Sequence, residues 1–200
     1  MPYDAAKDFA PVTQMLRVPN VLVINTETAQ RLKINSLNDF VAYAKANPGK
    51  LSYGSAGTGT TPHIGGELFK QNAGIFATHV PYRGAAPAIN DLLGQQVQMT
   101  FLDLPAILPH IRSGTLKPIA LGTTARAPTA PDVPTTVELG MPELRIENWY
   151  GMVAPSATPP AIIAALNKLT LTALADPNVK EKLAEQGLTV AGNSPEQFRD

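Results

Sequence analysis

The sequence predicts an α/β fold with a largely parallel sheet. Short apolar runs alternate along the chain with stretches in which apolar residues recur at helical spacing, and this alternation is typical of strands joined by helices. Glycines and prolines separate the two kinds of stretch and indicate the turns between them. With 44% hydrophobic and only 16% charged residues in 200, the chain has the composition of a globular protein with a core.

The first half of the chain predicts a strand, a capped helix and a strand–loop–helix unit. A strand is expected over 20–24, where apolar residues follow one another. Ser36 opens a capping pattern for a helix, since serine accepts hydrogen bonds from first-turn N–H groups. A short strand over 50–53 leads through a Gly-rich loop, residues 54–61, into a helix that begins near Pro62. The elements expected after it are strands over 77–81, 97–102 and 117–122 and helices over 87–93 and 106–111.

The composition changes after residue 124. Residues 125–142 are rich in proline and threonine, which predicts a surface crossing rather than a packed element. We therefore expect a boundary between two lobes just before this stretch. The elements expected beyond it are a strand over 146–153, helices over 159–175 and 177–186, and a short strand over 188–191.

Composition and charge exclude several classes of function. The chain has no cysteine and its three histidines do not share the spacing of a metal site, so neither a disulfide nor a metal is expected, and no cofactor either. Lys and Arg together number 16, as do Asp and Glu, which argues against a nucleic-acid partner. The apolar runs fall short of the roughly 20 residues of a spanning helix, so no direct membrane insertion is expected. No export signal is recognisable at the start, and we expect any such signal outside this stretch.

The Gly-rich loop is the most informative segment for function. Successive backbone N–H groups at a helix N-terminus bind anions without a charged side chain, and the serine and threonines of the loop add hydroxyl donors. The alternative interpretation is an ordinary turn in which glycine relieves backbone strain and Thr61 caps the helix. The ligand-binding residues predicted in this loop are Ser55, Ala56, Gly57, Thr58, Gly59, Thr60 and Thr61.

Two enzymatic interpretations of the same loop are tested by its sequence. The glycine spacing is that of a phosphate-binding loop, but Thr60 stands where the phosphate-contacting lysine belongs, which disfavours nucleotide triphosphates. Ser55 lies where a nucleophile elbow would place its serine, although Tyr53 replaces the first glycine of that motif. A serine hydrolase that uses Ser55, a histidine base and an orienting Asp103 is therefore the main alternative.

Further side chains are expected at the same edge of the sheet, because the carboxyl ends of parallel strands lie together. His63, in the first turn after the loop, either donates to a bound anion or packs. Tyr82 follows the next strand and could close over a ligand, whereas the neighbouring Arg83 is more simply explained as solvated. Asp103 follows the strand after that, where it either lines a cleft or caps the next helix.

A series of short sequence strings runs in order along the whole chain. The strings are Tyr3-Asp-x-x-Lys-Asp-Phe-x-Pro-Val12, Ser55-Ala-Gly-x-Gly-Thr60 with His63, His79-Val-Pro-Tyr-Arg-Gly84, Pro87-Ala88 with Asp91-Leu-Leu-Gly94, Pro131-Asp-Val-Pro-Thr135 with Glu138-x-Gly140, and Trp149-x-Gly-x-x-Ala-Pro155. Together they resemble the TctC/Bug family of extracytoplasmic solute receptors.

The resemblance implies a type II-like, two-lobed periplasmic-binding-protein fold with one lobe complete and the other partial. Residues 1–24 would belong to the partial lobe and the first crossing strand, 25–124 to the complete lobe, and 125–200 to the return into the partial lobe. It further implies a periplasmic receptor, not an enzyme, that holds a small carboxylate for the membrane components of a tripartite tricarboxylate transporter. Full members of the family have an export signal and a first βαβ stretch before the first string, so the resemblance implies a fragment. Receptor and hydrolase would use the same loop, since donors that hold a carboxylate can also hold an oxyanion.

Overall fold

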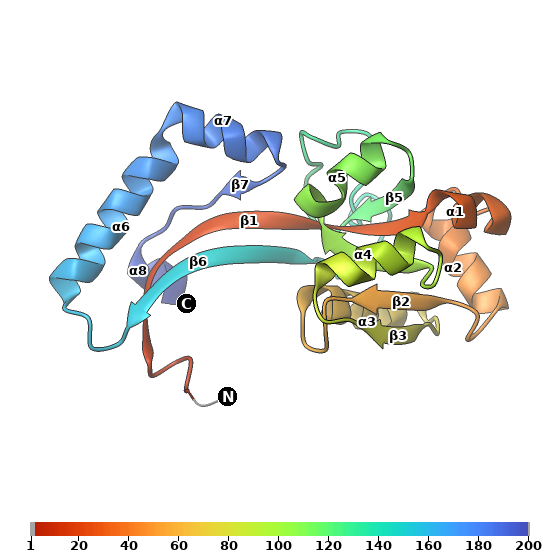
Figure 1. Cartoon of the computed structure of the whole chain (residues 1–200), viewed down its shortest axis with the longest axis horizontal. Helices are drawn as coiled ribbons and strands as arrows, with labels where there is room; N and C mark the ends of the chain where they lie inside the picture. Colours follow the sequence, from red (N-terminus) through yellow and green to blue (C-terminus); the bar gives the residue numbers. More distant parts are fainter. Residues whose placement is uncertain (1–2, 200) are drawn as a thin grey trace. The chain divides into compact units, whose positions relative to one another are not determined.

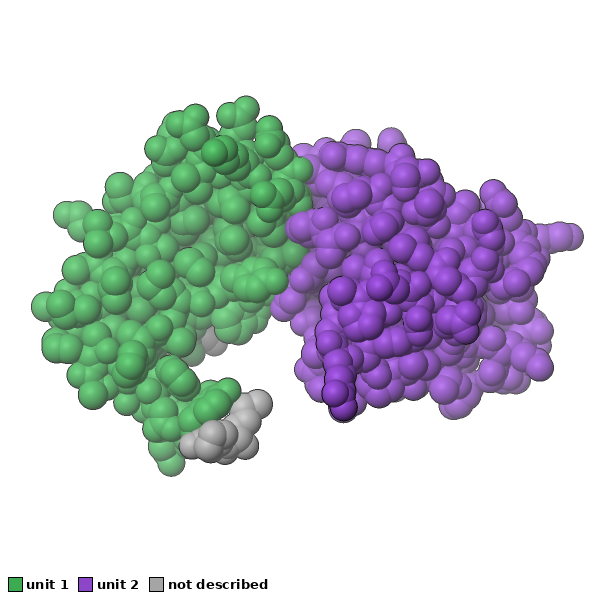
Figure 2. Space-filling model, in the orientation of Figure 1, with its two compact units in different colours: residues 1–18, 149–200 green, residues 19–148 purple. Residues whose placement is uncertain are grey.

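The computed structural model of this chain describes residues 3–199 and divides it into two compact units. Unit 1 consists of Met1–Val18 and Trp149–Asp200, and unit 2 of Pro19–Asn148 (Figure 2). The expected middle segment, 25–124, lies inside unit 2, which also includes residues 19–24 and 125–148. Strands β1 (Phe9–Asn25) and β6 (Glu147–Pro155) contribute residues to both units.

The sheet of unit 2 has the strand order β3-β2-β4-β1-β5 (Figure 1). Strand β2 pairs in parallel with β3 and β4, whereas β1 pairs antiparallel with β4 and β5. Four strands thus point the same way and β1 alone opposes them, so the predicted parallel sheet is in fact mixed. The remaining elements of this unit are β2 (Ser52–Ser55), β3 (Thr78–Pro81), β4 (Met99–Asp103), β5 (Leu116–Leu121), α1 (Thr26–Leu32), α2 (Leu37–Ala46), α3 (Thr61–Ala73), α4 (Ala85–Leu93) and α5 (Leu104–Arg112).

Both faces of this sheet are buried. On the central strand β1, Leu22 and Ile24 belong to one hydrophobic cluster, and Val21 and Val23 belong to another. Side chains alternate between the two faces of a strand, so a strand covered on both sides must be apolar at every position. This burial explains why 20–24 is the clearest strand signal in the sequence.

The proline-rich stretch that follows β5 is partly packed, where the sequence predicts a surface crossing. Three of its apolar side chains, Ala127, Ala130 and Val133, are buried in one of the two clusters. Two backbone groups of the stretch form hydrogen bonds with Leu121 of β5: the N–H of Leu121 donates to Pro134 O (2.8 Å), and its carbonyl accepts from Thr136 N (2.8 Å). Thr135 and Thr136 are buried here, because a neighbouring strand supplies hydrogen bonds that this irregular backbone lacks.

Unit 1 combines the first part of β1 with β6 and β7 (Thr189–Val190) and three helices. These helices are α6 (Pro160–Ala175), α7 (Pro177–Glu185) and α8 (Pro195–Arg199). Strand β7 pairs antiparallel with β1. Trp149, Val153 and Leu169 are large apolar residues that lie exposed in this unit. Within residues 3–199, no helix combines the length and the apolar character needed to cross a membrane.

Candidate ligand-binding site

The N-termini of three helices open at one edge of the unit 2 sheet. Strands β2, β3 and β4 are parallel, so their carboxyl ends lie at the same edge, and helices α3, α4 and α5 begin there. The N-cap residues are Thr60, Gly84 and Asp103, and within the described chain none of them accepts a capping hydrogen bond through its side chain. First-turn N–H groups are thus available, and helix N-termini favour negative charge.

A pocket of about 340 Å³ lies at this edge. All of its lining residues belong to unit 2, and they come from the Gly-rich loop, from the first turns of the three helices and from the start of β6. The lining residues are Ala56, Gly59, Thr60, Thr61, Pro62, Ala85, Leu102, Asp103, Ala106 and Asn148. Hydroxyl, amide and backbone groups therefore dominate the polar part of the wall, and Asp103 is its charged side chain.

The Gly-rich loop divides into residues that line the pocket and residues that support it. Ala56, Gly59, Thr60 and Thr61 line it, whereas Ser55, Gly57 and Thr58, which the sequence analysis also names, are not among the lining residues. Ser55 is fully buried and Gly57 adopts φ 130°, a conformation that favours glycine. The hydroxyl of Thr60 donates to Gly57 O at 2.6 Å, so it closes the loop instead of pointing a free donor at a ligand.

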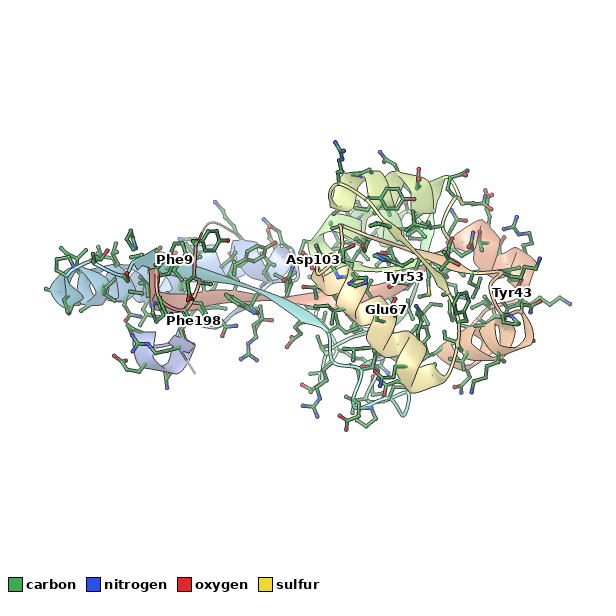
Figure 3. The ribbon with its side chains drawn as sticks, turned by 90° about the horizontal axis from the view of Figure 1, so that it is seen from below. Phe9, Tyr43, Tyr53, Glu67, Asp103 and Phe198 are labelled. Atoms are coloured by element: carbon green, nitrogen blue, oxygen red, sulfur yellow. The ribbon has the colours of Figure 1, made fainter. Side chains whose placement is uncertain are left out.

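Asp103, which is labelled in Figure 3, contacts the side chains of Asn20 and Asn148. Its Oδ1 accepts a hydrogen bond from Asn20 Nδ2 (2.8 Å), and the Nδ2 of Asn148 lies 3.4 Å from Oδ2 and 3.5 Å from Oδ1. Burial raises the pKa of the Asp103 carboxyl, and the hydrogen bonds from the two asparagines oppose this increase. Two donors do not use all of the acceptor sites of a carboxylate, so Asp103 can still accept a hydrogen bond from a ligand.

Asn20 directs the N–H of its side-chain amide at Asp103. Asn20 is fully buried, and among the described residues its Oδ1 has no hydrogen-bond partner. Leaving a buried acceptor unsatisfied costs about 1–3 kcal/mol. The opposite orientation would place the amide oxygen against an Asp103 oxygen, where two acceptors would face each other.

Asn148 is the functional candidate that sequence reasoning missed. It lies inside a predicted strand, and its amide both faces Asp103 and accepts a hydrogen bond from Thr61 Oγ1 at 3.2 Å. Two polar residues, Glu147 and Asn148, at the start of a mainly apolar strand are the signal that could have indicated it. The other lining residues that were not predicted, Pro62, Ala85, Leu102 and Ala106, are apolar and offer only backbone groups for recognition.

His63 and Tyr82 do not line the pocket. The Nδ1 of His63 accepts a hydrogen bond from Gly59 N at 3.2 Å, which places the ring behind the loop. The hydroxyl of Tyr82 donates to Asp91 Oδ2 at 2.6 Å, and burial together with this carboxylate raises the pKa of Tyr82 to about 12. Both side chains are engaged with protein groups and act on the pocket only through the loop and the helix that they contact.

The serine of the hydrolase alternative meets a histidine but no triad forms. Ser55 Oγ lies 2.7 Å from His79 Nε2. The ring of His79 is stacked between the rings of Tyr53 and His63, with centroid distances of 4.8 and 4.3 Å. Asp103, the expected orienting residue, bonds to Asn20 and Asn148 instead. Ser55 is fully buried and outside the pocket lining, so a substrate in the pocket would not reach its hydroxyl.

The two-lobed α/β fold predicted for the chain is confirmed by solved structures of periplasmic binding proteins. An R. palustris protein solved with adipate is 36% identical, matches with a TM-score of 0.91, and is aligned over 100% of this chain and 65% of its own. MatC from Rhodopseudomonas palustris, solved with bound malate, is 28% identical with a TM-score of 0.87, over 99% of this chain and 67% of its own.

Sequence comparison defines the family. Protein BugT of Bordetella pertussis is 38% identical over 199 residues, which are 100% of this chain and 60% of BugT. The family described as tripartite tricarboxylate transporter family receptor, TctC, matches residues 1–199. The chain therefore belongs to the TctC family, as the resemblance predicts. It spans about 60% of the length of BugT and of a second curated relative that it matches over 201 residues.

Proposed function

We propose that this chain is part of an extracytoplasmic receptor that captures a small carboxylate in the pocket of unit 2. One observation carries this function: helices α3, α4 and α5 begin at a pocket whose polar lining contains hydroxyl and amide groups but no Lys or Arg. Backbone N–H groups and helix dipoles are sufficient to hold a carboxylate. Unit 2 would be the complete lobe and unit 1 part of the other.

The pocket also indicates which carboxylates are favoured. A volume of about 340 Å³ suits a small organic acid. Asp103 repels a second carboxylate that faces it but accepts a hydrogen bond from a hydroxyl or ammonium group. Solved relatives carry adipate and malate, which supports a dicarboxylate ligand, and we propose that a hydroxylated acid such as malate fits Asp103 better than an unsubstituted one.

We propose a periplasmic location and a tripartite tricarboxylate transporter as partner. The family description names this transporter class, and solved relatives are described as periplasmic. The receptor would deliver its ligand to the membrane components of such a transporter. This delivery would need no covalent chemistry from the residues of the pocket.

A receptor is favoured over a serine hydrolase because Ser55 is buried and lies outside the pocket lining. We expect no hydrolysis of p-nitrophenyl esters above the uncatalysed rate. The matched control is Ser55→Ala, which removes the only hydroxyl that the hydrolase would use. Turnover that disappears in this variant would favour the enzyme and reject the receptor.

Calorimetric titration tests the proposed function. The purified chain would be titrated at pH 8 with malate, succinate, adipate and citrate, and with the neutral dimethyl ester of adipate as a matched control. We expect heat of binding from at least one acid and none from the diester, because the helix N-termini recognise charge. Equal binding of adipate and its diester, or no binding of any acid, would contradict a carboxylate site in this chain.

A further inference from the structure

The loop between β2 and α3 holds its shape through side chains behind it. Gly57 and Gly59 have φ of 130° and 84°, conformations that few residues adopt. The N–H of Gly57 donates to Ser55 Oγ (3.2 Å), and the Gly57 carbonyl accepts from Thr60 Oγ1 (2.6 Å). The N–H of Gly59 donates to His63 Nδ1 (3.2 Å). Gly59 is itself a lining residue, so this last bond fixes part of the pocket wall.

The bond from Gly59 defines the protonation state of His63. A backbone N–H can only donate, so Nδ1 must carry a lone pair and the ring proton must lie on Nε2. A protonated imidazole has a proton on both nitrogens and would oppose the Gly59 N–H with a second donor. The neutral ring is therefore the form that holds the loop as it is found here.

Several titratable groups surround His63. From β3, the His79 ring lies 4.3 Å from the His63 ring, and from β2 the hydroxyl of Tyr53 lies 3.5 Å from the His63 carbonyl. From α3 itself come Glu67 and Lys70, which pair at 2.8 Å, and Tyr53 donates to the same carboxylate at 2.6 Å. Lys70 and Tyr53 thus already bind the Glu67 carboxylate, so Glu67 does not need a protonated histidine as its partner.

The second imidazole adds to this arrangement. Burial lowers the pKa of His79, and the charge of Lys70, or a charge on His63, lowers it further, against the opposing effect of Glu67. A neutral His79 next to a neutral His63 allows the two rings to pack at van der Waals distance. Two cations at this distance would repel each other, so the pair favours at least one neutral ring.

We propose that His63 is the positioning residue of the ligand loop: its neutral Nδ1 holds Gly59 in place, and protonation releases Gly59 and weakens carboxylate binding. The predicted effect on ligand affinity rests on the proposed function. The contact between His63 and Gly59 is independent of that function. The sign is specific. A histidine that contacted the ligand directly would bind a carboxylate more tightly when protonated, whereas a histidine that positions the loop does the reverse.

Titration of three proteins with malate between pH 8 and pH 6 tests the inference. In this range histidine changes charge, whereas malate stays ionised. We expect the affinity of the parent to fall on acidification. His63→Asn offers Gly59 an amide oxygen near the position of Nδ1 and cannot titrate, so its affinity should match the parent at pH 8 and stay constant. His63→Leu lacks an acceptor and should bind about threefold to tenfold more weakly at both pH values.

Binding that tightens on acidification, or a pH dependence that persists in His63→Asn, would overturn the inference. A parallel measurement needs no ligand: the amide signal of Gly59 in ¹⁵N-labelled chain should move between pH 8 and pH 6 in the parent and stay fixed in His63→Asn. If no carboxylate binds to any of the three proteins, the proposed function fails. A Gly59 signal that ignores pH in the parent would instead reject the positioning role itself.

Discussion

Replacement of Asp103 by asparagine should change which acids the pocket prefers. The substitution keeps the shape of the side chain and an oxygen that can accept from Asn20, but removes the charge. A pocket of about 340 Å³ has a radius of roughly 4 Å, so a ligand carboxylate within it lies about 6 Å from Asp103. At this distance two like charges repel by about 3 kcal/mol at an effective dielectric constant of about 20. Solvent at this partly exposed group reduces the effect.

We therefore expect Asp103→Asn to bind adipate about tenfold more tightly at pH 8. Malate should gain less, because its hydroxyl loses a charged acceptor that contributes about 1.5–3 kcal/mol. Since burial raises the pKa of Asp103, its charge is lost earlier than usual on acidification, and the difference between parent and variant should shrink as the pH falls toward that pKa. Calorimetric titration of both acids measures these changes. Unchanged or weaker adipate binding, or an equal gain for malate, would refute the reasoning.

The substitution should not destabilise the fold at neutral pH. A carboxyl whose folded pKa is raised has its charged form disfavoured by folding, so the parent loses stability as the pH rises through its unfolded pKa toward the folded one. Asparagine at position 103 does not titrate and avoids this loss. A urea unfolding curve with an unchanged or higher midpoint would show that changes in affinity come from the pocket and not from unfolding.

The remaining predictions concern the loop and the helix behind it. Thr60→Ala removes the hydroxyl that closes the loop on Gly57 and should weaken malate binding about threefold to tenfold. Its control Ser36→Ala breaks the capping box of α2, and it should lower the free energy of unfolding by about 1 kcal/mol and leave the affinity unchanged. Equal affinities for Thr60→Ala and the parent would show that the loop is a structural turn only. Gly66→Ala places a methyl group in steric conflict with the buried Tyr53 ring. It should lower the free energy of unfolding by about 1–3 kcal/mol, despite the higher helix propensity of alanine. A variant that is more stable in thermal unfolding would contradict this packing.

The sequence predicts those elements whose burial pattern is local. Residues 21–24 of the predicted strand are all apolar because both faces of the strand are covered, and the Ser36 pattern forms the expected capping box. Strand β1 extends back to Phe9, however, and this part was not predicted, because the polar residues Thr13 and Gln14 interrupt the apolar run. Their partners come from distant residues such as Asn193, which no local pattern reveals.

The candidate site was predictable in its loop but not in its contacts. Glycine spacing before a helix indicated the segment that supplies Gly59, Thr60 and Thr61 to the pocket. Whether a neighbouring side chain faces the pocket or the interior depends on tertiary packing, so the sequence could not separate Ser55, bonded to His79, from the residues that line it. Asn148 reaches the pocket from a strand far along the chain, and only the three-dimensional fold brings it next to Asp103.

The most direct test of the carboxylate site is a ¹⁵N NMR titration of the chain with malate, which detects weak binding to one lobe. We expect saturable shifts of the backbone amides of Gly59, Thr61 and Ala106, which belong to the loop and to the first turns of α3 and α5. Amides in unit 1 helices and in α2 should stay in place in the same spectra. Shifts confined to other regions, or none at these residues at saturating malate, would contradict a carboxylate site at the helix N-termini of unit 2.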